Sequence, residues 1–398
     1  MRRAAIVSPV RTPVGAFGGA LRDVPVEALG SVVTKAALER TGLDPARIED
    51  VVFAQSYANS ETPCVGRWVA LEAGLPIETP GLQTDRRCGG GLQAIVTAAM
   101  MVETGACEVV LAGGVESMSR IEYYTTDMRW GKRSGSVQLY DRLDRGRERS
   151  QPVERFGYIS GMVDTAETLA REFAVSREEA DLFACESHRR AAKAWKDGRF
   201  QDEVVPVPVP QKKGDPVLFS SDEGIRADST VESLAKLRPL MKAGSVTAGN
   251  AAQQNDAAAA CLIVAEDKLA ELGLEPIAYL VGWSAVGCDP ARMGLGPVGA
   301  AAKVFRKTGL GFDDMGLVEV NEAFAAQVLA VLKGWNWDDR SRLNVNGSGI
   351  SLGHPIGATG VRMMTTLTHE MRRRGVRYGL ETMCIGGGQG MAAIFERA

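Results

Sequence analysis

Two stretches of this chain resemble each other, and this internal repeat constrains the fold more than any other feature. The string TGLDPARIEDVVF begins at Thr41, and TGLGFDDMGLVEV begins at Thr308, 267 residues later. A glycine-rich turn that leads into a helical pattern surrounds Cys88, and a similar turn surrounds His354, 266 residues later. Two unrelated features with nearly the same offset predict a duplicated α/β domain. A pseudo-twofold axis between the copies would bring Cys88 and His354 together at one interface.

The chain divides into three regions by its pattern of apolar residues. Residues 1–118 alternate short apolar runs with helical patterns, which is typical of a layered α/β domain. Residues 119–249 contain a run of charges and an alternation of Val and Pro, which predict a loop-rich insertion that covers a site. Residues 250–398 return to the α/β alternation. The clearest helices are expected at 26–41, directly after Cys88, at 162–172 and at 176–197.

The charge balance and the chain ends exclude several classes of protein. The 398 residues carry 46 basic and 49 acidic side chains, and no basic domain stands out, so we expect no nucleic-acid partner. No apolar stretch is long enough to span a bilayer, so no membrane partner is expected. The N-terminal stretch lacks the apolar run of a signal peptide, and the C-terminal FERA is not a peroxisomal address. A cytoplasmic location is the resulting expectation.

Cysteine and histidine usage narrows the search for a reactive site. The seven cysteines include no CxxC pair, which argues against a disulfide framework and against a zinc site, so no metal is predicted. Only three histidines are present. His188 and His369 lie in polar helical patterns and are expected to be solvated. His354, on a glycine-rich loop before a proline, is the candidate base toward a thiol.

Cys88 is the candidate nucleophile. It stands in TDRRCGGGLQA, where three glycines and then a helix follow it. Glycine lets a substrate approach the backbone, and a helix N-terminus supplies free N–H groups and partial positive charge. These features predict a thiol whose pKa lies below the usual value of about 8.5. A buried structural cysteine beside a turn is the alternative interpretation of the same string.

Two further strings carry chemistry. In ETMCIGGGQGMAAIFE, an apolar strand leads Cys384 to a run of glycines whose backbone N–H groups could hold an oxyanion. In VEVNEAFAA, Asn321 ends an apolar strand where a helix begins. An asparagine at this position can cap the helix, hold a water or polarise a carbonyl.

Taken together, the strings CGGGLQA, GGVESMS, NEAFA, GHPIGATG and CIGGGQG resemble the thiolase family in order and spacing, over essentially the whole chain. The resemblance implies a thiolase-like fold, with a duplicated five-layered α-β-α-β-α core and a loop-rich insertion domain. It implies ping-pong acyl transfer between acyl-CoAs, with Cys88 as nucleophile, His354 as its base and Cys384 moving the α-proton. No metal or redox cofactor is implied; acyl-CoA and coenzyme A are substrate and product, and a homodimer or homotetramer is expected.

The resemblance also assigns supporting roles. One oxyanion hole would use His354 and a water held by Asn321, and the other would use the backbone N–H groups of Cys88 and Gly386. Further positions resemble those that contact the CoA moiety or the acyl group in relatives: Arg226, Ser233, Met162, Met293, Phe324 and Ala252.

Several positions depart from the family pattern. Ala252 replaces a common Ser at the CoA thioester arm, Gln253 replaces a Gly, and Gly161 stands where short-chain members often have His. Gly90 replaces a Ser after the nucleophile, and residues 141–150 are more charged than a typical apolar lid. These departures leave the length, branching and carboxylation of the acyl group open, as well as the physiological direction.

Two alternative functions share parts of this pattern. A ketoacyl-synthase-like condensing enzyme would normally place His or Asn where Cys384 stands. A non-catalytic lipid-binding relative would usually lack Cys88 or His354. This chain retains all three residues, which favours the thiolase interpretation.

Overall fold

The computed structural model describes residues 2–398. Its core consists of two α/β halves whose elements follow the same order, except that β4 has no counterpart in the C-terminal half. The N-terminal half contains β1 (Ala4–Arg11), α1 (Val26–Thr41), β3 (Asp50–Ala54), α2 (Val65–Glu72), β4 (Leu82–Thr84), α3 (Gly90–Glu103), β5 (Val109–Ser117) and β10 (Asn255–Ala265). The C-terminal half contains β11 (Ala278–Gly287), α10 (Gly296–Thr308), β12 (Met315–Val320), α11 (Ala325–Trp335), α12 (Thr359–Arg374), β13 (Tyr378–Ile385) and β14 (Gln389–Arg397).

The strands of both halves form one ten-stranded sheet in the order β12-β13-β14-β11-β1-β10-β5-β3-β4, with β2 (Gly15–Ala16) paired to β10. Read outward from the β1–β11 junction, β11-β14-β13-β12 corresponds to β1-β10-β5-β3, and the N-terminal half has one further strand, β4, at its edge. The junction itself is short, because β1 and β11 pair only through Ala5 with Tyr279 and Ile6 with Ala278. The predicted duplicated fold is therefore confirmed. The boundary predicted at residue 249 falls just before β10, which pairs with β1 and β5 and so completes the N-terminal sheet.

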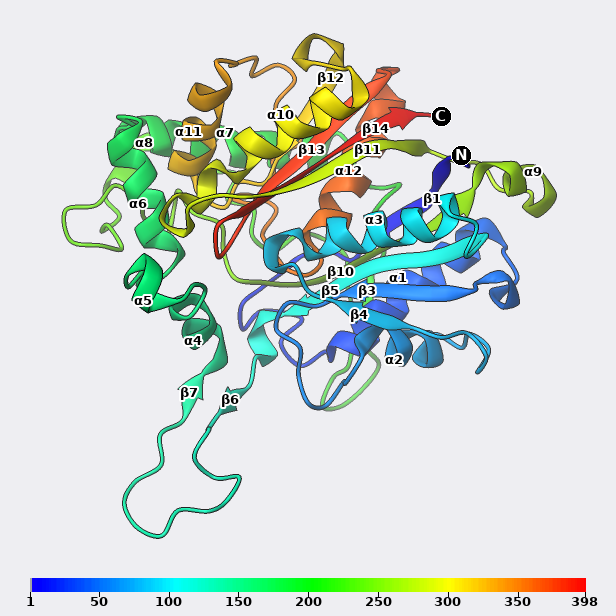
Figure 1. The fold of residues 1–398 in the computed structure, drawn as a ribbon, viewed down its shortest axis with the longest axis horizontal. Helices are drawn as coiled ribbons and strands as arrows, with labels where there is room; N and C mark the ends of the chain where they lie inside the picture. Colours follow the sequence, from blue (N-terminus) through cyan, green and yellow to red (C-terminus); the bar gives the residue numbers. More distant parts are fainter. Residues whose placement is uncertain (1) are drawn as a thin grey trace.

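The layers follow from which helices cover which face of the sheet. Figure 1 shows α1 and α2 outside the N-terminal strands, α10 and α11 outside the C-terminal strands, and α3 with α12 between them. One buried apolar cluster surrounds the two middle helices, and one more lies between the strands and the outer helices of each half. This arrangement gives the five layers α-β-α-β-α, with two helices from different halves in the middle.

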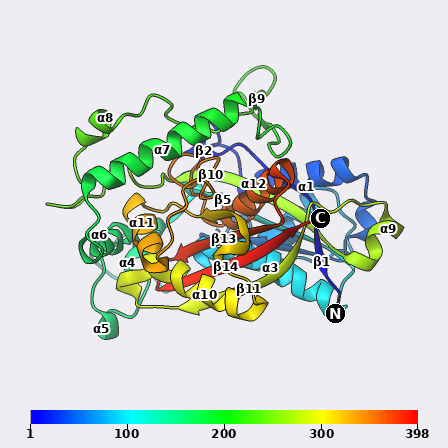
Figure 2. The same cartoon turned by 90° about the horizontal axis from the view of Figure 1, so that it is seen from above.

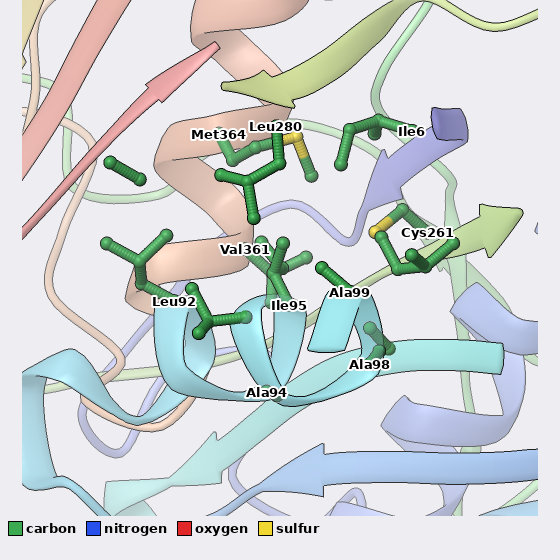
Figure 3. Close-up of a cluster of buried hydrophobic side chains, with 14 of the residues drawn as sticks. Ile6, Leu92, Ala94, Ile95, Ala98, Ala99, Cys261, Leu280, Val361 and Met364 are labelled. Atoms are coloured by element: carbon green, nitrogen blue, oxygen red, sulfur yellow. The ribbon is translucent and has the colours of Figure 1, made fainter. Parts of the chain in front are cut away.

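The central layer is packed closely because glycine lies where α3 crosses α12. Leu92 and Ile95 of α3 point into the central cluster together with Val361 of α12 (Figure 3). A Cβ on Gly91 would lie 2.8 Å from the backbone N of Val361, and a Cβ on Gly360 would collide with the backbone N of Leu92. Only glycine permits such an approach without displacing a helix. The two halves thus contact backbone to backbone near the start of each central helix.

The insertion between β5 and β10 carries the remaining elements: β6 (Tyr123–Tyr124), β7 (Tyr140–Asp141), α4 (Arg142–Glu148), α5 (Val153–Phe156), α6 (Met162–Glu172), α7 (Arg177–Lys196), β8 (Val207–Val209), β9 (Val217–Phe219) and α8 (Val231–Ala235), and a short α9 (Leu269–Leu272) follows β10. Helix α7 begins with a capping box between Ser176 and Glu179. The strands β6 and β7 form the base of an arm that extends away from the body (Figure 1), and α7 runs along one side with α8 beside it (Figure 2). Within residues 2–398, no helix is both long and apolar enough to cross a membrane.

A buried ionic cluster ties the insertion to the core. Arg11 of β1 contacts Glu203 through Nε at 2.7 Å and Asp222 through Nη1 at 2.7 Å, and all three side chains are buried. The Asp222 carboxylate also accepts from the Val14 backbone N–H and from the Trp195 indole N–H. Because every charged group in this cluster has a hydrogen-bonding partner, these bonds offset the free-energy cost of removing the charges from water.

Candidate active site

A cavity of about 250 Å³ lies where the insertion meets both halves of the core. The turn before α3 brings Cys88 to it, the loop before α12 brings His354, and the hairpin between β13 and β14 brings Cys384 and Gly386. Eight residues selected from the sequence line the cavity: Cys88, His354, Cys384, Gly386, Met162, Met293, Phe324 and Ala252. Segments separated by nearly 300 residues in the chain therefore meet at one place.

Cys88 lies in a single 3₁₀ turn, Arg87–Gly89, directly before α3. Burial raises the pKa of the Cys88 thiol, while the backbone N–H groups of Gly386 and of Cys88 itself and the charge of Arg87 act in the opposite direction. The lowered pKa expected from the sequence is therefore wrong, because desolvation of the thiolate outweighs the N–H groups and nearby charge. The thiol is protonated at neutral pH and needs a base.

His354 is held in one orientation by its neighbours. Its Nδ1 lies 2.7 Å from the Thr359 hydroxyl, which donates to the Pro355 carbonyl at 2.9 Å, and its backbone N–H donates to Asn255. A hydroxyl has one proton to donate, so Thr359 accepts from Nδ1–H and leaves Nε2 as the bare nitrogen. Burial, followed by the charges of Arg362 and Arg147, lowers the pKa of His354 to about 3. The imidazole is neutral and can accept a proton.

Asn321 lies next to the imidazole of His354 and is fully buried. Its Nδ2 is 3.4 Å from each ring nitrogen of His354, and its Oδ1 has no hydrogen-bond partner in the part of the chain that the structure describes. A buried amide oxygen without a partner is a position where a water binds favourably. Gly349 is needed beside it, because a Cβ there would lie 2.7 Å from this oxygen.

Cys384 is buried near the end of β13. Burial raises the pKa of its thiol well above the ordinary value, and negative charge on Cys88 or Cys288 raises it further. The turn that follows contains Gly387 and Gly388 at φ of +89° and +83°, a conformation that favours glycine. Cys384 is therefore a protonated thiol at neutral pH, close enough to Cys88 for the two charges to interact.

The remaining predicted residues lie away from the cavity lining. Arg226 is exposed, and its backbone N–H donates to Nδ1 of His188. Ser233 is exposed and forms the capping box of α8 with Thr230. The predicted solvation of two histidines is corrected, because His188 is buried, and His369 is half-buried with Nε2 3.1 Å from the Pro9 carbonyl. Polar neighbours along a helix did not reveal that these rings face inward.

Several lining residues were not selected from the sequence. Arg87, Arg142 and Arg147 line the cavity, as does Tyr57, and Thr359 contacts His354 behind it. The signal for Thr359 was its position five residues after His354 in GHPIGATG. Within residues 2–398, no group of three or more His, Cys, Asp or Glu side chains is arranged to hold a metal ion.

Comparison with known proteins gives a consistent result along the whole chain. The family model for the thiolase N-terminal domain matches residues 4–267, and the model for the thiolase C-terminal domain matches residues 274–397. An acetyl-CoA acetyltransferase of Chromobacterium violaceum is 45% identical over 395 residues, covering 99% of each chain.

Solved structures agree. The crystal structure of the Bacillus anthracis acetyl-CoA acetyltransferase has a TM-score of 0.96 and 42% identity, covering 100% of this chain and 99% of that chain. The human mitochondrial 3-ketoacyl-CoA thiolase in complex with CoA has a TM-score of 0.93 and 40% identity, covering 100% and 98%. With two family models, close relatives and matching folds over its full length, the chain belongs to the thiolase family of acyl-CoA C-acyltransferases.

Proposed function

We propose that this protein makes or thiolytically cleaves 3-ketoacyl-CoA, with Cys88 as the nucleophile that carries the acyl group. The observation that carries the proposal is the meeting of Cys88, His354 and Cys384 in one cavity, with the backbone N–H groups of Cys88 and Gly386 directed at the Cys88 sulfur. Such N–H groups also suit a negatively charged oxygen on the carbon that bonds to this sulfur.

In the cleaving direction, the Cys88 sulfur attacks the C3 carbonyl of the 3-ketoacyl-CoA while its proton passes to Nε2 of His354. The C2–C3 bond then breaks, and Cys384 donates its proton to C2 of the departing enolate. The raised pKa of Cys384 suits a donor, because the thiol stays protonated until the carbanion forms. Asn321, through a water on its unpartnered Oδ1, would hold the enolate oxygen together with His354.

In the second half of the cleavage, the thiol of free CoA attacks the acyl-Cys88 thioester and restores the Cys88 thiol. Synthesis runs these steps in reverse, so the Cys384 thiolate removes a proton from C2 of an acyl-CoA. Once Cys88 is acylated its sulfur cannot ionise, so no thiolate at Cys88 opposes the deprotonation of Cys384.

Coenzyme A is thus both substrate and product. The relatives compared above are named acetyl-CoA acetyltransferase and 3-ketoacyl-CoA thiolase, and one human structure contains CoA. By analogy, we assign Arg226 and Ser233 to the nucleotide and pantetheine of CoA and Ala252 to its thioester arm, with Met162, Met293 and Phe324 around the acyl group. The last four line the cavity.

Intact-protein mass spectrometry after incubation with a short acyl-CoA tests the assignment. The wild type and Cys384→Ala should gain the mass of one acyl group, and Cys88→Ala should gain none. Cys384→Ala should also lose turnover in condensation and thiolysis. Cys185→Ala, on the outer helix α7, is the control and should behave as the wild type. Acylation that survives Cys88→Ala would reject the nucleophile.

We also propose that the chain forms a homodimer or homotetramer. The arm between β6 and β7 presents apolar side chains to solvent, including Trp130 with 94% of its surface exposed and Leu139 with 65%. An apolar surface of this kind usually marks a protein contact. Light scattering on the wild type and on a variant with Trp130→Ser and Leu139→Ser tests this: the variant should have the smaller mass. A monomeric wild type would contradict the proposal.

A cytoplasmic location is proposed on the state of the cysteines. All seven are free thiols, which is typical of a reducing compartment. Cell fractionation with an antibody against the chain would test the location.

A further inference from the structure

Three arginines line the cavity beside the nucleophile, against one carboxylate, Asp85. Arg142 is paired with Glu122 at 3.1 Å. Arg147 is paired at 3.3 Å with Asp144, whose side chain is 69% exposed, so solvent screens this pair. The Arg87 guanidinium has no carboxylate within 4.0 Å among residues 2–398, and it contacts only the neutral carbonyl of Gly146, at 3.3 Å from both Nη1 and Nη2.

Arg87 is held in place by its backbone. It has a φ of +47°, a left-handed conformation that a side-chain-bearing residue adopts at a cost of about 1–3 kcal/mol. The Asp85 carboxylate accepts the Arg87 backbone N–H at 2.6 Å and stabilises this turn. Residues in such strained conformations cluster at active sites and ligand clamps. The Arg87 guanidinium lies close to Gly386, with Nη1 3.7 Å from the position of a Cβ on that residue.

The effect of these charges on the cavity is seen in its other groups. The charge of Arg147 contributes to the lowered pKa of His354. The charges of Arg147 and Arg87 both oppose the rise that burial causes in the pKa of Tyr57. Glu116 is a buried carboxylate near the cavity, where it could offset these positive charges. The backbone N–H groups of Ser56, Tyr57 and Gly357 already bind it, however. Among the side chains that line the cavity, cations therefore outnumber carboxylates, and the Arg87 guanidinium is the one without a carboxylate partner, which favours a ligand with a negative group.

The chemistry of CoA decides which part of the ligand carries that group. The phosphates of CoA are separated from its thioester sulfur by the whole neutral pantetheine arm. An anion that meets Arg87 while the reacting carbon is bonded to the adjacent Cys88 must therefore belong to the acyl group. A carboxylate is the anion an acyl chain can end in, and a guanidinium binds it with two parallel hydrogen bonds.

We infer that the acyl group transferred to Cys88 ends in a carboxylate bound by Arg87, with Arg147 as a second cation, so that the preferred substrates are 3-oxo-dicarboxylic acid mono-CoA thioesters. This inference rests on the proposed thiolase function and names its substrate class. The Cys88 sulfur bonds to C3, the C2–C3 bond breaks, and acetyl-CoA leaves after C2 takes the proton of Cys384. CoA–SH then takes the ω-carboxyacyl group from Cys88, returning a proton to the enzyme and giving a dicarboxylic acid mono-CoA thioester.

A matched pair of substrates tests the inference with the full chain. Thiolysis of 3-oxohexanedioyl-CoA is compared with thiolysis of 3-oxohexanoyl-CoA, and the eight-carbon pair is measured in the same way. The wild type should show a kcat/KM at least about tenfold higher for the dicarboxylic member of one pair, the size of one charge-assisted hydrogen bond. Equal or better cleavage of both methyl-terminated substrates would overturn the inference.

Arg87→Met isolates the charge while keeping an unbranched side chain in the strained turn. It should lower kcat/KM for the dicarboxylic substrate about 10- to 100-fold more than for the methyl-terminated substrate, whose smaller loss reflects removal of the charge beside Cys88. Activity on the methyl-terminated substrate also shows that the variant is folded. An equal loss on both substrates would overturn the inference, because it would place Arg87 at the reacting carbonyl rather than at the end of the chain.

Two further variants complete the design. Arg87→Lys should recover part of the dicarboxylic preference, since it keeps the charge but not the paired hydrogen bonds. Arg145→Met is the control: Arg145 lies on α4 with Arg147, pairs with Glu148 and does not line the cavity, so the substrate preference of this variant should match the wild type. Failure of the wild type to cleave any 3-ketoacyl-CoA would contradict the proposed function, whereas cleavage of only methyl-terminated substrates would contradict the substrate class alone.

Discussion

Thr359 connects the start of α12 to the chemistry at Cys88. Its hydroxyl has one proton, and the carbonyl of Pro355 accepts it. The bond between Thr359 and Nδ1 of His354 therefore fixes which ring nitrogen carries hydrogen. The resulting tautomer presents a bare Nε2, which is the form that a proton acceptor needs. Thr359 is a positioning residue, because it acts through His354.

Thr359→Val should lower kcat at least about tenfold, since neutral imidazole then adopts either tautomer and loses its fixed orientation. KM should change little, because the side chain does not line the cavity. Thr365→Val is the matched control, as Thr365 is also buried on α12 and bonds the carbonyl of Val361 without contacting a histidine. Wild-type kcat in Thr359→Val would show that the tautomer is set elsewhere, and Thr359→Ser should restore activity.

The protonation of His354 can be observed directly, because the chain has only three histidines. The pKa lowered to about 3 means that the ring stays neutral as the pH falls through the usual histidine value of about 6.5. In protein labelled with ¹³C-histidine, the ring signal missing from His354→Ala should not shift between about pH 5.5 and about pH 8. A titration midpoint near the usual value would contradict the description of this ring as desolvated.

At the scale of elements, the crossing of α3 and α12 sets the position of both reacting residues. Gly91 and Gly360 each occupy the second position of their helix, and each leaves no room for a Cβ. Cys88 precedes one helix and His354 precedes the other. A change in the distance between the two backbones would therefore move Cys88 relative to His354. A displacement of about 1 Å between reacting groups is enough to lower the rate strongly.

Gly360→Ala should lower the free energy of unfolding by about 1–3 kcal/mol and reduce kcat, because the added methyl group collides with the backbone of Leu92. Gly299→Ala in α10 is the control: its Cβ would meet Val286 at an ordinary 3.4 Å, and the alanine should be neutral or stabilise by up to about 1 kcal/mol. Urea unfolding and steady-state kinetics measure the two effects. Unchanged stability in Gly360→Ala would contradict the tight crossing.

The elements themselves were largely predictable from the sequence. The expected helices 26–41 and 162–172 coincide with α1 and α6, because periodic apolar residues are a local property of the chain. The repeat predicted that Cys88 and His354 lie close together. In a duplicated fold, equivalent turns occupy equivalent places in the two halves, so the two glycine-rich turns meet at the interface. The raised pKa of Cys88 was not predictable, because it depends on how completely the folded chain removes water from the sulfur.

At the scale of the whole molecule, Arg11 joins the insertion to the core. Its partners Glu203 and Asp222 lie 192 and 211 residues away in sequence. Glu203 also accepts from Thr366 of α12, so three distant segments share one cluster. No local pattern in the sequence indicates such pairs, because their partners lie about 200 residues apart. The bonds fix the insertion relative to β1 and α12, and hence relative to the cavity.

Arg11→Met should lower the free energy of unfolding by about 3–5 kcal/mol, because it leaves two buried carboxylates without their cation. Arg22→Met, which removes an exposed pair with Asp23, should change the free energy by less than about 1 kcal/mol. Calorimetry on both variants provides the comparison, and similar losses in the two would contradict the structural role of Arg11.

The glycine crossing also limits how the two halves can diverge. Their outer helices and loops face different surroundings, so mutations there can accumulate independently in each copy. At Gly91 and Gly360, by contrast, each half is the steric environment of the other, and a larger residue in one requires a compensating shift in its duplicate. The duplication therefore gave a molecule whose copies could specialise, one supplying the proposed nucleophile and the other the proposed base and second thiol, while the two remain in contact through the glycine crossing.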